Sequence, residues 1–250
     1  MKLSLVTGAA SGIGRETALQ MARSGYHCVA VDVNVEGGQA LAEEALSGGL
    51  SLTFVPADVS DDHETDNLFS HLRDIKMPLT ALVNAAAIVT FNNPEDISLA
   101  DWDRIIRVNL RSVWLMCNKA RSLMAESGGG AIVNISSVHA WATDNLVSPY
   151  TASKGGISAL TRALAVAWGC QGIRVNAVLP GPIDTPLMRS NLRAVGDEEE
   201  EYAKIGARLA LGRVGQPIEI AHVVEFLCSM KASFVTGAEI LVDGGMLAHA

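Results

Sequence analysis

The sequence predicts a single α/β domain in which a doubly wound parallel sheet of seven strands carries helices on both faces. Short runs of β-branched and apolar residues alternate with longer segments of helical period, which is typical of a parallel sheet covered by helices. The length of 250 residues suits one such domain, and 49% hydrophobic with 18% charged residues excludes a disordered or low-complexity chain. No Pro/Gly/Ser-rich linker and no internal repeat divides the sequence, so one domain is predicted over residues 1–250.

Seven strands are predicted where short apolar runs would be buried on both faces of the sheet. Their ranges are 3–6, 28–31, 52–55, 80–83, 131–135, 174–178 and 239–242. Helices are predicted in the intervals, at 13–24, 37–46, 64–73, 101–126, 150–168 and 218–229.

One long segment interrupts this alternation after the sixth strand. From Gly181 the chain passes two prolines and an acidic cluster at 197–201 before it reaches Gly215. Long insertions at the carboxyl end of a strand form lids over binding sites, so residues 183–215 are predicted to be a substrate lid. The four consecutive glutamates at 198–201 are interpreted as a solvated helix face.

Charge and cysteine content exclude several classes of function. With 19 Lys and Arg against 27 Asp and Glu, the net charge of −8 opposes binding to nucleic acid or to an anionic membrane. No apolar run approaches the roughly 20 residues of a membrane span, and the first residues have a strand pattern rather than that of a signal peptide. The four cysteines lie far apart without metal-ligand spacing, so we expect buried reduced thiols, no metal and a cytoplasmic location.

A glycine-rich turn between the first strand and the first helix is predicted to bind a pyrophosphate. Glycines there let backbone N–H groups and the positive end of the helix approach the phosphates. The spacing is Gly-x-x-x-Gly-x-Gly, which departs from the usual dinucleotide fingerprint, and a merely structural turn is the alternative. The residues predicted to bind a cofactor in this turn are Gly8, Ser11, Gly12, Ile13 and Gly14.

Asp32 ends the second predicted strand region, 18 residues after Gly14. This is close to the roughly 20-residue offset at which an acid binds the adenosine ribose diol, where it would also repel a 2′-phosphate. Neither Ser11 nor Val33 supplies a cation to hold that phosphate, so NAD is predicted over NADP, with Asp32 and Val33 at the ribose. The alternative for Asp32 is a helix N-cap or a turn residue.

Tyr150 and Lys154 lie four residues apart at the start of a predicted helix, so their side chains share one face. A free tyrosine titrates at about pH 10, but a nearby ammonium group and a nicotinamide cation would favour the phenolate, which lets the pair act as an acid/base. Ser137 follows the fifth strand and reaches the same edge of the sheet as the glycine turn and Asp32. Three reactive groups thus converge, although a Tyr-x-x-x-Lys pattern alone also arises by chance.

Taken together along nearly the whole chain, these motifs resemble the compact branch of the short-chain dehydrogenase/reductase family. The resemblance implies a Rossmann-like fold. Besides the residues above, it is carried by 58–59, 84–87, 108–109, 180–185, 236–237 and 242–245. One departure is visible, because Ala87 stands where the family often has glycine, and this puts the local backbone geometry in doubt more than the activity.

The resemblance also implies roles for individual residues. Tyr150 would be the acid/base, Lys154 would bind the nicotinamide ribose and lower the tyrosine pKa, and Ser137 would hydrogen-bond the substrate oxygen. Asn109 would support a water that leads a proton from Lys154 to solvent. Further cofactor contacts would come from Asp58, Val59, Asn84, Ala85, Ala86, Pro180, Gly181, Ile183 and Thr185, the last two at the carboxamide.

A homotetramer is a further implication of the resemblance. The helix at 101–126 and the helix with many small residues at 152–167 would pair with their copies. Small residues let another helix approach closely, but packing on the sheet of the same chain is the alternative.

The substrate is predicted from the segment 138–145, which joins the predicted serine and tyrosine and should wall the pocket. His139, Trp141 and Asn145 combine an aromatic plate with hydrogen-bonding groups, which suits a sugar or polyol. For each of the three, packing or solvation away from the pocket is the alternative.

The predicted reaction is hydride transfer between a secondary alcohol and NAD, with alcohol oxidation as the direction used in the cell. A 3-oxoacyl thioester or hydroxysteroid reductase/dehydrogenase of the same fold is the alternative. A non-catalytic NAD(H)-sensing binding protein and an isomerase or dehydratase that uses the nicotinamide transiently are rivals of other classes. The joint presence of the four predicted catalytic residues favours an enzyme over the sensor.

Overall fold

The computed structural model describes residues 1–248, so residues 249 and 250 of the predicted domain lie outside it. The strands are β1 (Lys2–Thr7), β2 (Tyr26–Asp32), β3 (Leu52–Pro56), β4 (Leu79–Asn84), β5 (Gly130–Ile135), β6 (Ile173–Pro180) and β7 (Glu239–Val242). The helices are α1 (Gly12–Arg23), α2 (Val35–Ser47), α3 (Asp62–Asp74), α4 (Leu99–Ile106), α5 (Ser112–Glu126), α6 (Ser148–Trp168), α7 (Pro186–Val195), α8 (Glu198–Ala207) and α9 (Pro217–Cys228). Every predicted strand and helix except 101–126 lies within two residues of its predicted bounds.

The strands form one parallel sheet in the order β3-β2-β1-β4-β5-β6-β7. Strands are added in one direction from β1 to β3 and in the other from β4 to β7, so the order reverses between β1 and β4. This confirms the predicted doubly wound, Rossmann-like fold. Sheets of this kind bind ligands outside the carboxyl ends of their strands, at the reversal.

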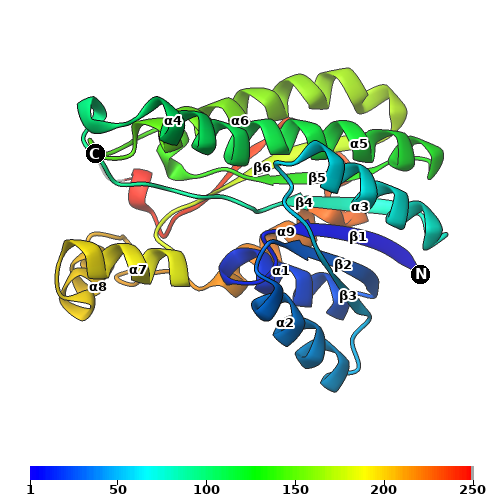
Figure 1. Ribbon diagram of the computed structural model, residues 1–250, viewed down its shortest axis with the longest axis horizontal. Coiled ribbons are helices and arrows are strands. Elements are labelled where there is room, and N and C mark those ends of the chain that lie inside the picture. Colours follow the sequence, from blue (N-terminus) through cyan, green and yellow to red (C-terminus); the bar gives the residue numbers. More distant parts are fainter. Residues whose placement is uncertain (249–250) are drawn as a thin grey trace.

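Each face of the sheet has its own hydrophobic core, because successive strand residues point to opposite faces. Leu3 and Leu5 of β1 pack into the core shared with α3, α5 and α6, whereas Val6 packs into the core shared with α1, α2 and α9. Figure 1 shows these two sets of helices on opposite sides of the sheet. The cores hold the strand ends in fixed positions relative to one another, which is what a binding site at that edge requires.

The prediction of one continuous helix at 101–126 is wrong, because a π-helical turn divides it. Helix α4 ends at Ile106, a π-helical turn spans Arg107–Arg111, and α5 begins at Ser112. The turn contains Asn109, whose buried side chain bonds to backbone groups of another loop. Single π turns within helices are frequent at functional sites, and hydrophobic periodicity gives no sign of them.

The segment 183–215 forms two helices, α7 and α8, which project from one end of the sheet (yellow in Figure 1). Helix α8 begins with the four glutamates after the N-cap Asp197, whose side chain accepts a hydrogen bond from Glu200 N. Acidic side chains in a first helical turn are favoured by the helix dipole. Glu199 and Glu200 are exposed, as expected for a solvated helix face, whereas Glu198 and Glu201 are half-buried and Glu198 pairs with Arg189 and Arg193.

All four cysteines are free thiols. Cys28, Cys117 and Cys228 are buried as predicted, and burial raises the pKa of each to about 12. The prediction is wrong for Cys170, which is exposed because it lies in the short turn that ends α6. None of the helices within residues 1–248 combines the length and the apolar composition needed to cross a membrane.

Candidate active site

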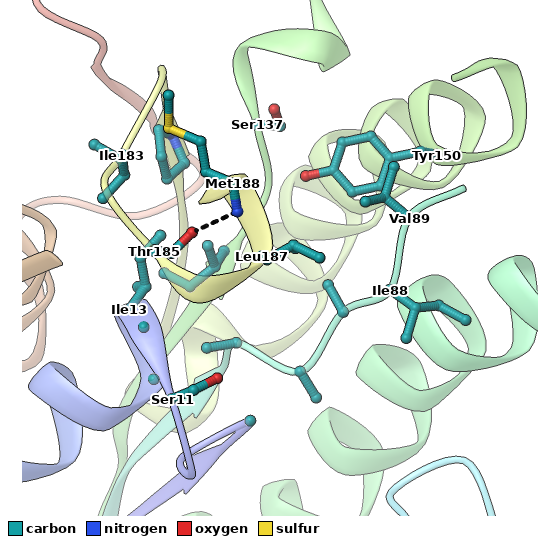
Figure 2. Close-up of a pocket in the computed structure, with 18 of the residues that line it drawn as sticks. Ser11, Ile13, Ile88, Val89, Ser137, Tyr150, Ile183, Thr185, Leu187 and Met188 are labelled. Carbon is teal, nitrogen blue, oxygen red and sulfur yellow. Dashed lines mark hydrogen bonds between the residues drawn. The ribbon is translucent and has the colours of Figure 1, made fainter. Parts of the chain in front are cut away.

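A cleft of about 780 Å³ runs along the carboxyl ends of the strands. It is lined by every predicted cofactor residue except Asn84 and by every predicted catalytic residue except Asn109. Figure 2 shows the Tyr150 hydroxyl pointing into this cleft, with Leu187 and Met188 of α7 opposite. Within the part of the chain that the structure describes, no group of three or more His, Cys, Asp or Glu side chains is placed to hold a metal ion.

In the glycine turn after β1, the backbone lies close to the loop after β4 and to the first turn of α1. Gly8 and Gly12 have φ angles of 66° and 55°. A Cβ on Gly8 would lie 2.7 Å from the Ala86 backbone, and one on Gly14 would lie 2.1 Å from the Gly8 carbonyl oxygen. The N-cap of α1, Ser11, makes no side-chain capping bond, and the first turn of α1 contains no acidic residue. Unpaired N–H groups at a positive helix end, free of side chains, fit an anionic group such as a pyrophosphate.

Asp32 lines the cleft at the end of β2. Its Oδ2 accepts a hydrogen bond from Ala10 N and its Oδ1 accepts one from Asn34 N, each at 2.9 Å. These bonds hold the carboxylate beside the glycine turn. The N-cap of α2 is Asn34 and not Asp32, so Asp32 is a turn residue that also faces the cleft. Among the described lining residues the single cation is Lys154, which lies beside Tyr150.

The residues after β3 continue this part of the cleft. Ala57 N donates a hydrogen bond to Asp32 O at 3.1 Å, which places the end of β3 next to the end of β2. Asp58 and Val59, which follow, line the cleft together with Val33.

The residues after β4 divide between the cleft and the interior. Ala85 and Ala86 line the cleft, and their N–H groups donate to Thr7 Oγ1 at 3.1 and 3.3 Å. Asn84 instead points into the sheet, where its Nδ2 donates to Asn134 Oδ1 at 2.9 Å. Asn84 therefore anchors the strand end and does not line the cleft.

Helix α6 presents Tyr150 and Lys154 in its first two turns. Lys154 Nζ lies 5.3 Å from the centroid of the Tyr150 ring and donates to Ile135 O, at the end of β5, at 2.8 Å. Ser137 follows β5, lines the cleft and accepts a hydrogen bond from His139 N at 3.2 Å. The structure thus brings the serine, the tyrosine and the lysine to one end of the cleft.

Burial determines the protonation of these groups. It raises the pKa of Tyr150, and hydrogen bonding to Ser137 opposes this rise. It lowers the pKa of Lys154 to about 7. The groups of the protein therefore keep Tyr150 as a neutral phenol at neutral pH. From the sequence, Lys154 was expected to lower the pKa of Tyr150, but Lys154 is not among the groups that shift it. A positive charge placed in the cleft would act in the direction that the sequence predicts.

Asn109 lies in the π turn behind the cleft and is fully buried. Its Oδ1 accepts from Ile88 N at 2.9 Å, and its Nδ2 donates to Ile88 O at 2.8 Å and to Ser153 Oγ at 3.2 Å. Asn109 thus fixes the loop after β4, of which Ile88 lines the cleft. Its predicted role in a water relay stays a prediction.

Of the three predicted substrate residues outside the catalytic group, the structure brings one to the cleft. The His139 ring lines it and meets the Tyr150 ring edge to face, with centroids 5.7 Å apart and an interplanar angle of 80°. Trp141 is 60% exposed and its Nε1 donates to Glu239 Oε2 at 2.7 Å, because a carboxylate on β7 offers a charge-assisted partner. Asn145 is exposed and is not among the lining residues. Trp141 and Asn145 therefore do not wall the pocket as predicted.

The segment 183–215 is fastened where it leaves and rejoins the sheet. Ile183 pairs with Gly215 in an isolated parallel bridge, and Asp184 N donates to Gly215 O at 2.8 Å. Thr185, one of the predicted carboxamide contacts, lines the cleft and caps α7 by accepting from Met188 N at 3.2 Å (Figure 2). Pro180 and Gly181, just before the segment, also line the cleft.

Arg189 ties the two helices of this segment to its first residues. Its Nε and Nη2 donate to the two oxygens of Asp184 at 2.7 and 2.9 Å, and its Nη1 donates to Glu199 at 2.8 Å. Its guanidinium also lies 4.0 Å from the centroid of the Tyr202 ring on α8. Hydrogen bonds from Arg189 lower the pKa of Asp184. The planar fork of an arginine suits this bidentate contact and lysine would not reproduce it.

Sequence reasoning missed two serines that support the site. Ser136 Oγ donates to Lys154 O at 2.9 Å, and Ser153 Oγ donates to Tyr150 O at 2.6 Å. Both are buried, and each directly precedes a predicted catalytic residue. A hydroxyl residue at an otherwise apolar buried position is the signal that could have found them, since such a group needs a hydrogen-bond partner.

Known proteins resemble this chain over nearly its whole length. A family model described as enoyl-(acyl carrier protein) reductase matches residues 8–247. Cyclohexanol dehydrogenase of an Acinetobacter species is 36% identical over 97% of this chain and 94% of that protein. D-threitol dehydrogenase of Mycolicibacterium smegmatis is 35% identical over 98% of this chain and 92% of that protein.

Solved structures show the same fold. Levodione reductase has a TM-score of 0.95 and 32% identity, covering 100% of this chain and 98% of that one. A variant of actinorhodin polyketide ketoreductase with NADPH has a TM-score of 0.94 and 31% identity, covering 98% of this chain and 97% of that one. The chain is an oxidoreductase that acts on CH–OH groups with a nicotinamide cofactor, and it belongs to the short-chain dehydrogenase/reductase family.

Proposed function

We propose that the chain is an NAD-dependent dehydrogenase that transfers a hydride between a secondary alcohol and NAD, with Tyr150 as the acid/base. The observation that carries this proposal is the meeting of Tyr150, Ser137 and Lys154 in the cleft that the glycine turn and Asp32 also line. A bound nicotinamide ring would supply the hydride acceptor. The relatives include dehydrogenases named for a cycloalkanol and for a polyol, which supports a secondary alcohol. The sugar or polyol of the sequence prediction is therefore one of the two kinds of secondary alcohol to be compared.

The side chains divide the proton chemistry between them. Tyr150 exchanges the proton of the reacting hydroxyl, and Ser137 hydrogen-bonds the same oxygen as its charge changes. Lys154, fixed by its bond to Ile135 O, keeps its amino group beside the Tyr150 ring. Because burial holds Tyr150 protonated, the phenol is ready to donate in ketone reduction, whereas alcohol oxidation needs the phenolate. The rate of oxidation is therefore expected to rise with pH.

The variant Tyr150→Phe tests the chemistry. Removing a positioned acid/base is expected to lower kcat by about 10²- to 10⁴-fold while NADH binding stays intact, because the ring and its packing remain. NADH formation is followed optically with a panel of secondary alcohols, and NADH binding by fluorescence titration. Tyr26→Phe is the matched control, since the Tyr26 hydroxyl donates a long hydrogen bond of 3.5 Å to Cys228 O and Tyr26 does not line the cleft. Undiminished turnover by Tyr150→Phe would refute the assignment.

The preference for NAD is proposed from Asp32. Its carboxylate stands beside the glycine turn with no cation among the described lining residues near it, so a ribose diol would be bound and a 2′-phosphate repelled. The similar ketoreductase structure contains NADPH, so the two cofactors must be compared directly.

Asp32→Asn keeps the side-chain shape and removes the charge. Loss of a charge-assisted hydrogen bond of about 1.5–3 kcal/mol is expected to raise KM for NAD on the order of 10- to 100-fold, while KM for NADP falls. The ratio of kcat/KM for NAD and NADP is measured for both proteins. A wild-type enzyme that prefers NADP would overturn the proposed cofactor.

We also propose a homotetramer and a cytoplasmic location. Trp102 on α4, Trp114 on α5 and Val166 on α6 expose 39%, 47% and 87% of their surface, which supports pairing of these helices with their copies. Gel filtration with light scattering tests the assembly, and a monomer would contradict it. The buried free thiols fit a reducing compartment, which fractionation of cells tests.

A further inference from the structure

The cleft wall around Tyr150 is made mainly of hydrocarbon. The lining residues there come from the loop after β4, from the residue before α6 and from α7, and they are Val89, Phe91, Val147, Leu187, Met188 and Leu192. Phe91 and Leu187 still expose 41% and 43% of their surface. An apolar molecule in the cleft would remove this surface from water.

Beyond the catalytic group, the polar side chains that line this end include His139, Ser190 and Asn191, and two of the three already have a hydrogen-bond partner. Ser190 of α7 donates its hydroxyl to Leu187 O at 2.8 Å, within its own helix. His139 has its Nδ1 3.3 Å from Thr143 Oγ1, and burial lowers its pKa, so it stays neutral. Trp141 and Asn145, which would have served a sugar, lie outside the cleft. Asn191 of α7 also lines the cleft and could serve a hydroxyl group, as could the second ring nitrogen of His139. A substrate with more hydroxyl groups than these few side chains can serve, such as inositol with six, would therefore bury some of them without a partner.

The charges that line the cleft restrict the substrate in a second, independent way. The charged residues among the described lining are Asp32, Asp58 and Lys154. The first two follow β2 and β3, and Lys154 is held by Ile135 O behind Tyr150. No arginine or further lysine of the described lining stands ready for a carboxylate or a phosphate on the substrate. Burying such an anion without a cation is costly.

We propose that the substrate is a neutral secondary alcohol whose remaining atoms are mostly hydrocarbon, such as a cycloalkanol, and not a polyol or a hydroxy acid. This inference rests on the proposed function, because it takes Tyr150 as the residue that meets the reacting hydroxyl. Each methylene buried against the wall improves binding roughly fourfold. Each hydroxyl buried without a partner weakens it by about 5- to 100-fold.

Alcohols built on one six-membered ring isolate these effects, because ring size stays constant while polarity changes. Cyclohexanol, 1,4-cyclohexanediol, inositol and 4-hydroxycyclohexanecarboxylate are compared with NAD as the oxidant. Oxidation moves a hydride from the carbinol carbon to NAD and the hydroxyl proton to Tyr150, which gives the ketone and NADH. We expect kcat/KM to fall from cyclohexanol to the diol and to be at least about 100-fold lower for inositol. The carboxylate is also expected to be a poorer substrate than cyclohexanol.

The outcomes separate this inference from the proposed function. Turnover of inositol or the carboxylate with kcat/KM equal to or above that of cyclohexanol overturns the inference and leaves the dehydrogenase intact. If the protein oxidises none of the alcohols with NAD and does not reduce cyclohexanone with NADH, the proposed function is overturned. In that case, binding of cyclohexanol and inositol to the NADH-loaded protein, measured by calorimetry, decides the nature of the cleft, and equal or tighter binding of inositol refutes the inference.

A substitution in the wall supplies the matched test. Leu187→Asn keeps a side chain of similar size and replaces hydrocarbon by an amide, so it is expected to lower kcat/KM for cyclohexanol about 10-fold and to affect inositol less. Leu211→Asn is the control, because Leu211 is 67% exposed, belongs to the same segment and does not line the cleft. Equal losses for both alcohols in Leu187→Asn would show a structural effect and contradict the assigned role of the apolar wall.

Discussion

Gly14 is the described glycine whose added Cβ would approach backbone atoms most closely, and Gly14→Ala tests the geometry of the nucleotide end of the cleft. An added Cβ would lie 2.1 Å from the Gly8 carbonyl oxygen, 2.7 Å from the Gly8 carbonyl carbon and 3.1 Å from Thr7 O. All three are backbone atoms, which cannot turn aside as a flexible side chain does. Either the glycine turn or the start of α1 must move.

The size of the effect follows from the cost of overpacking. Forcing an extra carbon into a close-packed site costs about 1–3 kcal/mol, which lowers Tm by about 2–12 °C in a domain of this length. Displaced N–H groups lose charge-assisted hydrogen bonds to phosphate of about 1.5–3 kcal/mol, so NADH should bind on the order of 10- to 100-fold more weakly. We therefore expect binding and stability to fall together.

Gly169→Ala is the matched control for the same chemical change. Gly169 has a helical φ of −55° and ψ of −40°, is exposed, and has no atom within 4 Å of an added Cβ. Alanine there should leave NADH binding unchanged and raise stability by about 0.4–1 kcal/mol. Thermal unfolding and NADH fluorescence titration measure both variants. Wild-type values of Tm and NADH affinity in Gly14→Ala would refute the argument from close approach.

Two further predictions concern Lys154 and Arg189. Between the pKa of about 7 that burial gives Lys154 and its ordinary value of 10.5, the unfolded chain binds more protons than the folded one, so the free energy of unfolding should rise with pH by up to about 1.4 kcal/mol per pH unit. Lys154→Met should lack this contribution in urea unfolding at pH values from 7 to about 9, and identical pH slopes in the two proteins would contradict the burial of an ionisable lysine. Arg189→Met removes the fork to Asp184 and the contacts to α8, so we expect KM for the alcohol to rise several-fold while NADH affinity stays near the wild-type value. An unchanged KM would show that the fork does not position the wall of the cleft.

The fold was predictable because its signals are local and periodic. Each strand is a short apolar run buried on both faces, and its register is fixed by the two cores rather than by special residues. The error at 101–126 arose because hydrogen bonds to a distant loop change the helix locally, although the apolar residues keep a helical period. Asn109 bonds both backbone groups of Ile88, and the helix accommodates it with a π turn that the pattern of apolar residues does not reveal.

The nucleotide end of the cleft was also predictable, because its residues are attached to strand ends whose positions the sheet determines. The alcohol end was not. Trp141 directly follows the short turn Val138–Ala140, and its direction is set by Glu239, which lies 98 residues away in the sequence. Leu187 and Met188 line the cleft from α7, a helix that was not predicted from the sequence within the expected lid. Proximity in the chain to Ser137 was therefore a poor guide to contact with substrate.

Two features that cost stability lie beside the cleft. The side chain of Lys154 is buried and bonds to a backbone carbonyl, with no salt bridge to a carboxylate of residues 1–248, and a π turn interrupts the helical segment that contains Asn109. A chain selected for folding alone would have little reason to keep both of them next to one cleft. If burial of Lys154 serves chemistry rather than folding, Lys154→Met should be inactive and yet more stable than the wild type at neutral pH. A destabilised Lys154→Met would instead make the lysine a structural residue.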